Sequence, residues 1–420
     1  MRATTLLRVL LGLKHTRILS FEVTETALVI SVKPAKRTSF CSGCGRRAPR
    51  YDRRPRRWRH LDLFGIFVEL EYEVWRVECA SCGVTTEMVP WADADSGFTR
   101  PFEDVVALLA QRTDKTMVSS LMAIAWKSVG RIVERVVRRL GRKDQLEGVR
   151  NIGIDELSYR RHHEYITVVT DHDRGHVIWA VPGKDGAAVQ TFFDALGPER
   201  TAKIETVTID LTNAYKRAVA VGAPNARVVF DRFHVQRLAH EALDLVRRGQ
   251  VRELKGTKEA HAVKNTRFAL QKNPWNLTQP EHEKLVLVQE TNRPLYRAYL
   301  LKETLASILD GRQVNVARDR LAEWLGWAAR SRLAPFTKLA KTIKAHAHGI
   351  LAYVATRLSN GRVEGMNGKI RTITRRSFGL HGPSSLIALI RLCCSGIVVP
   401  LPHRLPDLTS LAPRAGPQTH

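Results

Sequence analysis

Two short cysteine motifs limit the possible folds of this chain more than any other feature of its sequence. Each motif reads Cys-x-x-Cys-Gly, and together they supply Cys41, Cys44, Cys79 and Cys82. Structural zinc takes four thiolates in a tetrahedron, and the glycine after each pair lets the backbone curl around the ion. The motifs therefore predict a zinc ribbon with one structural Zn²⁺ whose coordination positions are all filled by protein. Four unrelated buried cysteines are the alternative.

The segment between the two motifs is dense in arginine. Its part from Arg46 to Arg59 holds one acid, Asp52, the aromatic residues Tyr51 and Trp58, and eight arginines: Arg46, Arg47, Arg50, Arg53, Arg54, Arg56, Arg57 and Arg59. The whole chain has 67 Lys and Arg against 41 Asp and Glu, a net charge of +26, and such a charge favours polyanionic partners. We interpret the segment as a loop that contacts the DNA backbone, and a solvated basic loop is the alternative. The 44% hydrophobic content excludes a disordered polyelectrolyte.

Helical periodicity begins near residue 99 and predicts three helices with a tight turn before the last one. Apolar residues that include Phe102, Met117 and Leu121 recur at helical spacing. This pattern is typical of a helix-turn-helix, although a plain three-helix bundle produces it too. The residues expected to contact DNA from the last helix are Lys127, Ser128, Arg131 and Arg135.

The remainder of the chain predicts a mixed α/β sheet of the RNase H-like class with a long helical insertion. After residue 150, three strands are followed by helix, strand, helix and strand, and residues beyond 235 show almost only helical patterns. The expected domains are residues 1–40 (a helix and two strands), 41–83 (zinc ribbon), 99–143 (helix-turn-helix), 150–398 (catalytic domain, with the insertion at about 236–353) and 399–420 (a Pro-rich mobile tail).

Three carboxylates are the candidate catalytic residues. Asp155 and Asp210 end apolar strands, and Glu364 lies on a late helix. The first and fourth strands are neighbours in an RNase H-like sheet, so the two aspartates should meet and share hard divalent cations, with Glu364 brought across by its helix. A salt-bridge partner among the surrounding basic residues is the alternative role for Glu364.

The helix of Glu364 has two predicted faces. An inward stripe contains Val363, Met366, Ile370 and Ile373, and the adjoining face contains Glu364, Asn367, Arg371 and Arg375. We expect Arg371 and Arg375 to line a groove that accepts DNA phosphates, with Asn367 supporting the carboxylates.

Other residues near the strand ends are expected to have lesser roles. Glu156 should point to the opposite face of the sheet from Asp155. Asp231 and His234 are candidates for orienting the substrate or the carboxylates, with helix capping an equal alternative for Asp231. Trp275 is expected in a buried core, with stacking on a DNA base as the alternative.

Taken together, these motifs resemble the ISL3 family of bacterial insertion-sequence transposases. The matching segments are Gly153-Ile154-Asp155-Glu156, Asp210 with Tyr215, Asp231-Arg232-Phe233-His234-Val235, and Ser359-Asn360-Gly361 through Glu364, Asn367 and Lys369. The order of zinc ribbon, helix-turn-helix and split catalytic core also matches. The resemblance implies that Asp155, Asp210 and Glu364 are a DDE triad. Departures such as Ser377-Phe378-Gly379-Leu380 do not affect the triad.

The sequence thus predicts a DNA transposase that binds the inverted-repeat ends of its element and target DNA. Two Mg²⁺ (or Mn²⁺) ions per active site would support strand cleavage and transfer, and synapsis of two ends implies a homodimer or larger assembly. Alternatives are a transposase-derived DNA-binding regulator without catalysis and a structure-specific nuclease of the same fold. Because no apolar run is long enough to span a membrane, we expect a cytoplasmic, nucleoid-associated bacterial protein without membrane contact.

Overall fold

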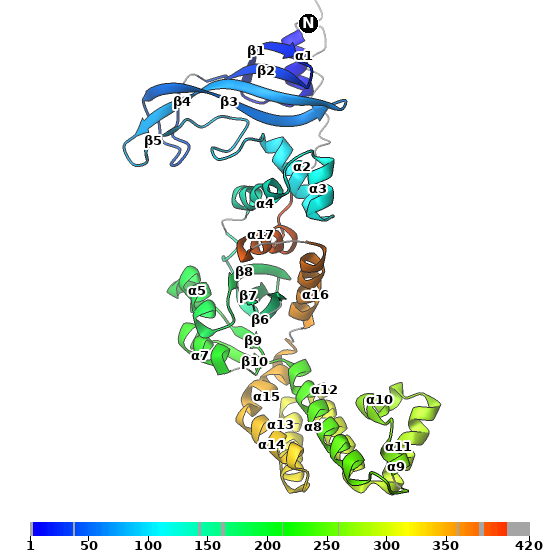
Figure 1. Cartoon of the computed structure of the whole chain (residues 1–420). Coiled ribbons are helices and arrows are strands. Elements are labelled where there is room, and N and C mark those ends of the chain that lie inside the picture. The colour runs from blue at the N-terminus through cyan, green and yellow to red at the C-terminus, as the bar shows by residue number, and fades with distance from the viewer. Residues whose placement is uncertain are drawn as a thin grey trace, which may run out of the picture. The chain divides into compact units, whose positions relative to one another are not determined.

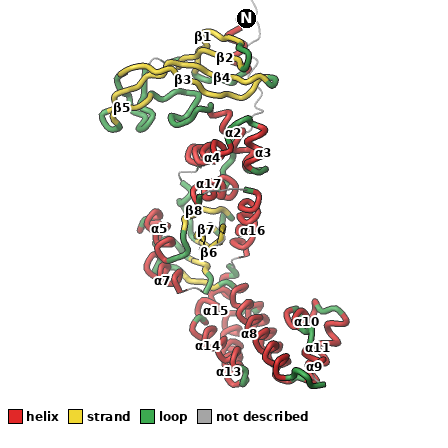
Figure 2. The backbone as a smooth tube through the Cα atoms, viewed as in Figure 1, coloured by secondary structure: helices red, strands yellow, loops and turns green. Residues whose placement is uncertain are grey.

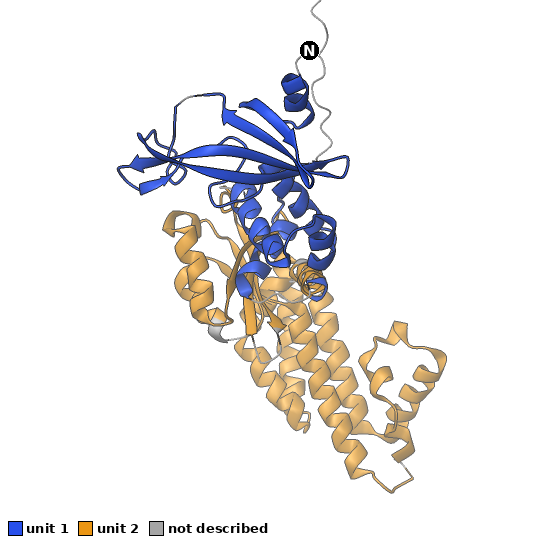
Figure 3. Ribbon diagram, turned by 45° about the horizontal axis from the view of Figure 1, so that its top comes forward, with its two compact units in different colours: residues 1–142, 375–420 blue, residues 143–374 orange. Residues whose placement is uncertain are grey.

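The computed structural model describes residues 3–400 except 37, 142–143, 161–163, 212, 259, 359–360 and 378–381. The chain divides into two compact units, residues 1–142 with 375–420 and residues 143–374 (Figure 3). The Pro-rich tail beyond residue 400 and the Ser359-Asn360 part of the family motif lie outside the described residues. No helix in the described ranges has the length and apolar character needed to cross a membrane.

The first unit opens with helix α1 (Ala3–Leu10) and a five-stranded sheet (Figure 1). Its strands are β1 (Thr16–Val23), β2 (Ala27–Pro34), β3 (Arg50–Leu63), β4 (Ile66–Cys79) and β5 (Gly83–Thr86). The order is β1-β2-β4-β3, with β5 on β4, and β2 runs parallel to β4. The first two strands therefore continue the ribbon sheet instead of forming a separate body.

The arginine-dense segment is a strand from Arg50 onward, so the expectation of a loop is wrong for all of it except Arg46 and Arg47. Strand β3 pairs with β4 along most of its length, and the turn between them contains Phe64 and Gly65, both with positive φ. Consecutive left-handed residues give a turn whose twist matches that of the two strands. Trp58 packs inward from β3 against Trp91, with ring centroids 5.6 Å apart. Inward packing of one face leaves arginines on the other face exposed.

Helices complete the described part of the first unit. They are α2 (Arg100–Ala110), α3 (Lys115–Leu121), α4 (Trp126–Leu140) and α17 (Pro383–Cys394). Ser385 of α17 donates to Glu134 of α4 at 2.9 Å, and the Gln111 amide donates to the Leu392 carbonyl at 2.8 Å. Helix α17, which we expected to close the catalytic domain, therefore packs on the helix-turn-helix helices.

The second unit contains a five-stranded mixed sheet in the order β10-β9-β6-β7-β8. The strands are β6 (Asn151–Arg160), β7 (Glu164–Asp171), β8 (His176–Pro182), β9 (Thr206–Ile209) and β10 (Arg227–Phe230). Helices α5 (Gly186–Leu196), α6 (Pro198–Thr201) and α7 (Asn213–Gly222) connect them. Strands β6, β9 and β10 are parallel, and β7 and β8 are antiparallel neighbours. The first and fourth strands of the sheet are adjacent, as the RNase H-like prediction requires.

A helical insertion follows β10, and its described part contains no strand (Figure 2). Its elements are α8 (Arg232–Glu253), α9 (Ala260–Val263), α10 (Arg267–Gln271), the 3-10 turn η1 (Pro274–Asn276), α11 (Gln279–Thr291), α12 (Arg293–Asp310), α13 (Val314–Arg330), α14 (Ala334–Ala345) and α15 (Ala347–Thr356). Within the insertion, the indole N–H of Trp324 on α13 donates to the Leu301 carbonyl on α12 at 2.8 Å. Trp275 is 74% exposed, so the expectation of a core tryptophan is wrong. The chain then returns to the sheet through α16 (Gly361–Arg376).

Candidate functional site

Three aspartates form a row across the parallel strands of the second unit. Gly153 of β6 is level with Thr208 of β9, so the same register sets Asp155 level with Asp210 two residues later. Ile209 is level with Phe230 of β10, which sets Asp231 beside Asp210. Adjacent strands lie about 4.8 Å apart, so consecutive carboxylates in the row are neighbours.

Helix α16 brings Glu364 to this row because β6 has a glycine where the helix crosses it. A methyl group built on Gly153 would lie 2.5 Å from Cγ2 of Val363 and 2.9 Å from both His172 Nε2 and Thr208 Oγ1. No other residue type would allow this approach without displacing a neighbour. Val363 is fully buried in the contact, and Glu364 is the next residue along the helix.

One cavity of about 390 Å³ receives Asp155, Asp210 and Glu364, whereas Asp231 is buried and is not among its lining residues. Its lining residues are Asp155, Glu156, Asp210, Phe233, His234, Arg237, Glu364, Asn367 and Arg371. All three members of the expected triad are included. Arg375, one helical turn beyond Arg371, is exposed and does not line the cavity.

Asp155 is held by two donors. The Asn367 amide donates to its Oδ2 at 2.6 Å, and the backbone N–H of Glu156 donates to its Oδ1 at 2.8 Å. Burial, followed by the nearby charge of Asp210, raises the pKa of Asp155 to about 7. Burial and the charge of Asp231 likewise raise the pKa of Glu364. The cavity therefore concentrates negative charge that a cation would offset.

Glu156 belongs to the cavity as well as Asp155. Its carboxylate accepts a hydrogen bond from Tyr215 of α7, whereas Asp155 is bound by Asn367 of α16. Alternation along β6 thus directs the two acids to different helices, as expected. Both side chains nevertheless line the cavity, and they do so from the middle of β6, since this strand continues to Arg160. Burial raises the pKa of Glu156 too.

Asp231 and His234 lie at the start of α8. Asp231 is the N-cap residue, and its carboxylate accepts from the His234 backbone N–H at 3.4 Å, so the capping alternative is met. Ligand atoms of Asp231, His234 and Glu364 also lie within 4.8 Å of one another. The expectation that Asp231 lies a strand farther from Asp155 is consistent with the sheet order, but that position sets it close to Glu364.

Two cavity residues, Arg237 and Phe233, were not among the sequence candidates. Both side chains are exposed, and both lie on the first turns of α8 beside His234. Helical spacing from His234 to Arg237 was the available signal, because residues three apart share a helix face.

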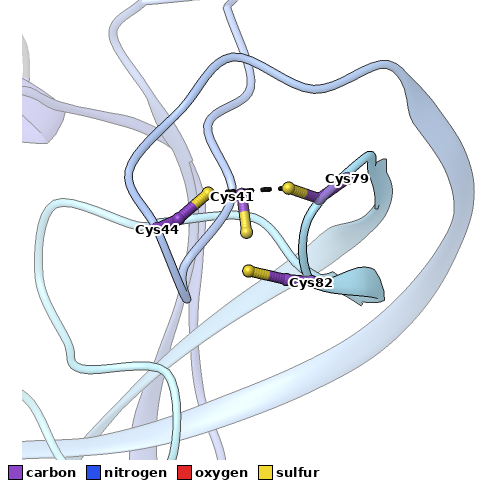
Figure 4. A group of neighbouring side chains, drawn as sticks. All are labelled: Cys41, Cys44, Cys79 and Cys82. Carbon is purple, nitrogen blue, oxygen red and sulfur yellow. Dashed lines mark hydrogen bonds between the residues drawn. The ribbon is translucent and has the colours of Figure 1, made fainter.

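The four cysteines of the first unit form a separate cluster (Figure 4). Their sulfur atoms lie within 4.8 Å of one another, and Cys44 Sγ is 3.5 Å from Cys79 Sγ. Thiolates around tetrahedral zinc lie about 3.8 Å apart, given Zn–S bonds of about 2.3 Å. The all-sulfur donor set and its spacing fit one structural Zn²⁺.

The arginines of β3 divide into two groups. Arg56 donates to the carbonyls of Ala94 and Ser96 at 2.8 Å each, and Arg59 donates to Asp62. Arg56 thus joins β3 to the segment before α2, whereas the Arg59 bond lies within β3 itself. Arg53 and Arg54 are exposed, and the Arg53 guanidinium stacks 4.0 Å above Trp75. The exposed group remains the candidate for DNA contact.

The helix-turn-helix residues divide in the same way. Lys127 and Arg131 are exposed on α4, and Ser128 is half-buried. Arg135 is buried and pairs with the fully buried Glu103 at 2.6 Å, so the expectation that it projects toward DNA is wrong. Its charge is instead used to join α4 to α2.

Apolar packing around α3 also differs from the prediction. Met117 and Leu121 are 55% and 62% exposed, although their spacing favoured a buried face. Helix α3 is short and buries Val118 and Lys115 against its neighbours, so its apolar residues on the other side remain in solvent.

Comparisons with known proteins agree with this architecture. A family model described as "Transposase" matches residues 152–390, one described as "Helix-turn-helix domain of transposase family ISL3" matches 87–137, and one described as "zinc-finger of transposase IS204/IS1001/IS1096/IS1165" matches 37–82. The transposase for insertion sequence element IS1557 from Mycobacterium tuberculosis is 41% identical over 439 residues, covering 96% of this chain and 98% of that protein. The transposase for IS1001 from Bordetella parapertussis is 28% identical over 373 residues, covering 88% and 92%. The chain therefore belongs to the ISL3 family of insertion-sequence transposases.

Proposed function

We propose that this transposase binds the terminal inverted repeats of an insertion sequence and catalyses DNA strand cleavage and strand transfer with Asp155, Asp210 and Glu364. The observation that supports the proposal is the cavity in which carboxylates from β6, the end of β9 and α16 meet. A structural ion pair would lower the pKa of Asp155, whereas burial and the nearby like charge raise it. Ion pairing therefore does not explain why these carboxylates meet.

The same three carboxylates fit Mg²⁺ or Mn²⁺, since hard divalent cations prefer oxygen ligands. In our proposal they hold two ions per active site. Bound Mg²⁺ lowers the pKa of coordinated water and stabilises negative charge on phosphate oxygens.

The surrounding residues of the chain position the carboxylates and the DNA. Asn367 and the Glu156 N–H fix both oxygens of Asp155, which limits the directions in which this carboxylate can ligate. Arg237 and Arg371 supply guanidinium groups at the cavity, and these suit phosphate oxygens geometrically. Backbone phosphates would therefore be drawn toward the acids by two guanidinium charges.

DNA recognition belongs to the first unit in this proposal. Lys127 and Arg131 on α4 would enter a groove, and Arg53 and Arg54 on β3 would contact phosphates. Strand transfer needs two element ends held together, so we propose that at least two copies assemble on DNA.

A strand-transfer assay with pre-cut element ends and a plasmid target tests the proposal. We expect the wild type to join ends in Mg²⁺, and Asp155→Asn to bind ends normally in gel shift while joining falls more than about 100-fold, because removing a ligand costs more than removing an outer-shell partner. Asp173→Asn is the matched control, since Asp173 is an exposed acid outside the cavity.

The other outcomes of this assay would contradict the proposal, each in a different way. Joining retained by Asp155→Asn would refute the carboxylate assignment. End binding without cleavage in the wild type would indicate a DNA-binding regulator, and cleavage without joining would indicate a nuclease.

A further inference from the structure

A set of donors beside the cavity differs in chemistry from the aspartate row, with His234 and Glu364 in the lining of the cavity and Asp231 buried next to them. Asp231 follows β10, His234 lies on the first turn of α8, and Glu364 lies on α16, with ligand atoms within 4.8 Å of one another. An ion bound about 2.1 Å from each ligand holds ligand atoms within about 4 Å, so small side-chain rotations would bring all three into range.

Helix capping ties the Asp231 carboxylate to the first turn of α8, where His234 lies. The Asp231 carboxylate accepts the backbone N–H of His234, which sets both residues on one turn. Asp231 is 1% exposed, and burial of a carboxylate is costly unless positive charge compensates it. Arg237, one turn beyond His234, is exposed at the cavity.

A buried amide oxygen in the same cavity points independently to a ligand. Asn367 is 2% exposed and lies one helical turn after Glu364. Its amide nitrogen is used by Asp155, whereas its Oδ1 has no hydrogen-bond partner among the described residues. A buried acceptor of this kind requires a donor or a cation, either directly or through bound water.

We propose that Asp231, His234 and Glu364 hold a divalent cation through two carboxylates and one imidazole nitrogen, beside the Asp155–Asp210 pair. The inference rests on the proposed function for the identity of the cavity and deepens it by naming a nitrogen ligand. Imidazole suits first-row transition metals better than it suits Mg²⁺. The imidazole therefore favours a first-row transition-metal ion over Mg²⁺ at this site, with Mn²⁺ as the paramagnetic member of the series used as the probe, and Glu364 contributes both here and to the Asp155–Asp210 pair.

Pulsed electron paramagnetic resonance of the full chain loaded with Mn²⁺ tests the nitrogen ligand directly. A coordinated imidazole couples its ¹⁴N nucleus to Mn²⁺, and this coupling does not depend on catalysis. We expect the coupling in the wild type, its loss in His234→Gln, and a Mn²⁺ dissociation constant at least about tenfold higher in that variant. His282→Gln on α11 is the matched control, because His282 is exposed and outside the cavity.

Asp231→Asn separates ligation from capping. Asparagine caps helices as well as aspartate does, so α8 should remain folded while one anionic ligand is lost. We expect weaker Mn²⁺ binding with an unchanged circular dichroism spectrum and melting temperature. Unchanged Mn²⁺ affinity in this variant would assign Asp231 to capping alone and overturn its role as a ligand.

The remaining outcomes distinguish this inference from the proposed function. Mn²⁺ that binds without ¹⁴N coupling, or coupling that persists in His234→Gln, would overturn the nitrogen ligand and leave the Asp155 and Asp210 carboxylates as the metal site. Absence of Mn²⁺ binding to the zinc-loaded wild type would overturn both.

Discussion

Substituting Gly153 by alanine should move Glu364 without touching any acid. The added methyl would lie 2.5 Å from Val363 Cγ2, whereas carbon atoms pack at about 3.5–4.0 Å. Helix α16 must therefore retreat by about 1 Å, because the other two neighbours, His172 and Thr208, are buried and hydrogen-bonded to each other at 2.7 Å. Overpacking of this kind costs about 1–3 kcal/mol of stability.

Activity should fall more than stability does. Glu364 follows Val363 and moves with it, and a displacement of about 1 Å at a reacting centre costs about 100-fold in rate. We expect Gly153→Ala to unfold at lower urea concentration, to bind element ends normally, and to join them about 100-fold more slowly. Adding Val363→Ala removes the nearest clash and should restore part of the joining rate.

Gly368→Ala is the control for this experiment. Gly368 lies on the same helix, and a methyl group built on it would meet no heavy atom within 4 Å. Alanine there should stabilise α16 by about 0.5–1 kcal/mol through helix propensity. If Gly153→Ala matched the wild type in both stability and joining, the close approach of α16 to β6 would be refuted.

Three further predictions concern charge and metal. Since burial raises the pKa of Asp155 to about 7, the contribution of Asp155 to stability is greatest below pH 4 and is lost as the pH rises toward 7. Urea unfolding without added Mg²⁺ or Mn²⁺ should show this loss in the wild type but not in Asp155→Asn. Parallel pH profiles of the two proteins would contradict the prediction. Removal of zinc by a chelator should increase hydrogen exchange around the four cysteines and leave exchange in the β6 sheet unchanged; equal protection with and without chelator would exclude a structural metal. Replacing Arg53 and Arg54 by alanine should reduce the salt dependence of end binding by a log–log slope of about 1–2, and an unchanged slope would remove β3 from the DNA interface.

The sequence by itself determined the features that depend on neighbours along the chain. Paired Cys-x-x-Cys-Gly turns identify the zinc site, because two ligands of each pair come from one turn. Strand and helix periods located the elements of the mixed sheet and the insertion. Asp155 and Asp210 were predicted as a pair because each follows an apolar run. Strand β6 continues past Asp155 to Arg160, however, so the parallel register of β6 and β9, and not a shared strand end, sets the two residues level.

Only the tertiary structure decided which side chains remain exposed to contact DNA or lie close enough together to bind a ligand. Arg135 and Lys127 are similar in sequence context, yet Arg135 is buried by Glu103 from another helix and Lys127 is exposed. Likewise, the approach of Asp231 to Glu364 depends on sheet register and on a glycine in β6 that admits α16. Periodicity reports which face of an element is apolar, but pairing, burial and ligand geometry depend on residues distant in the chain, so no local pattern contains them.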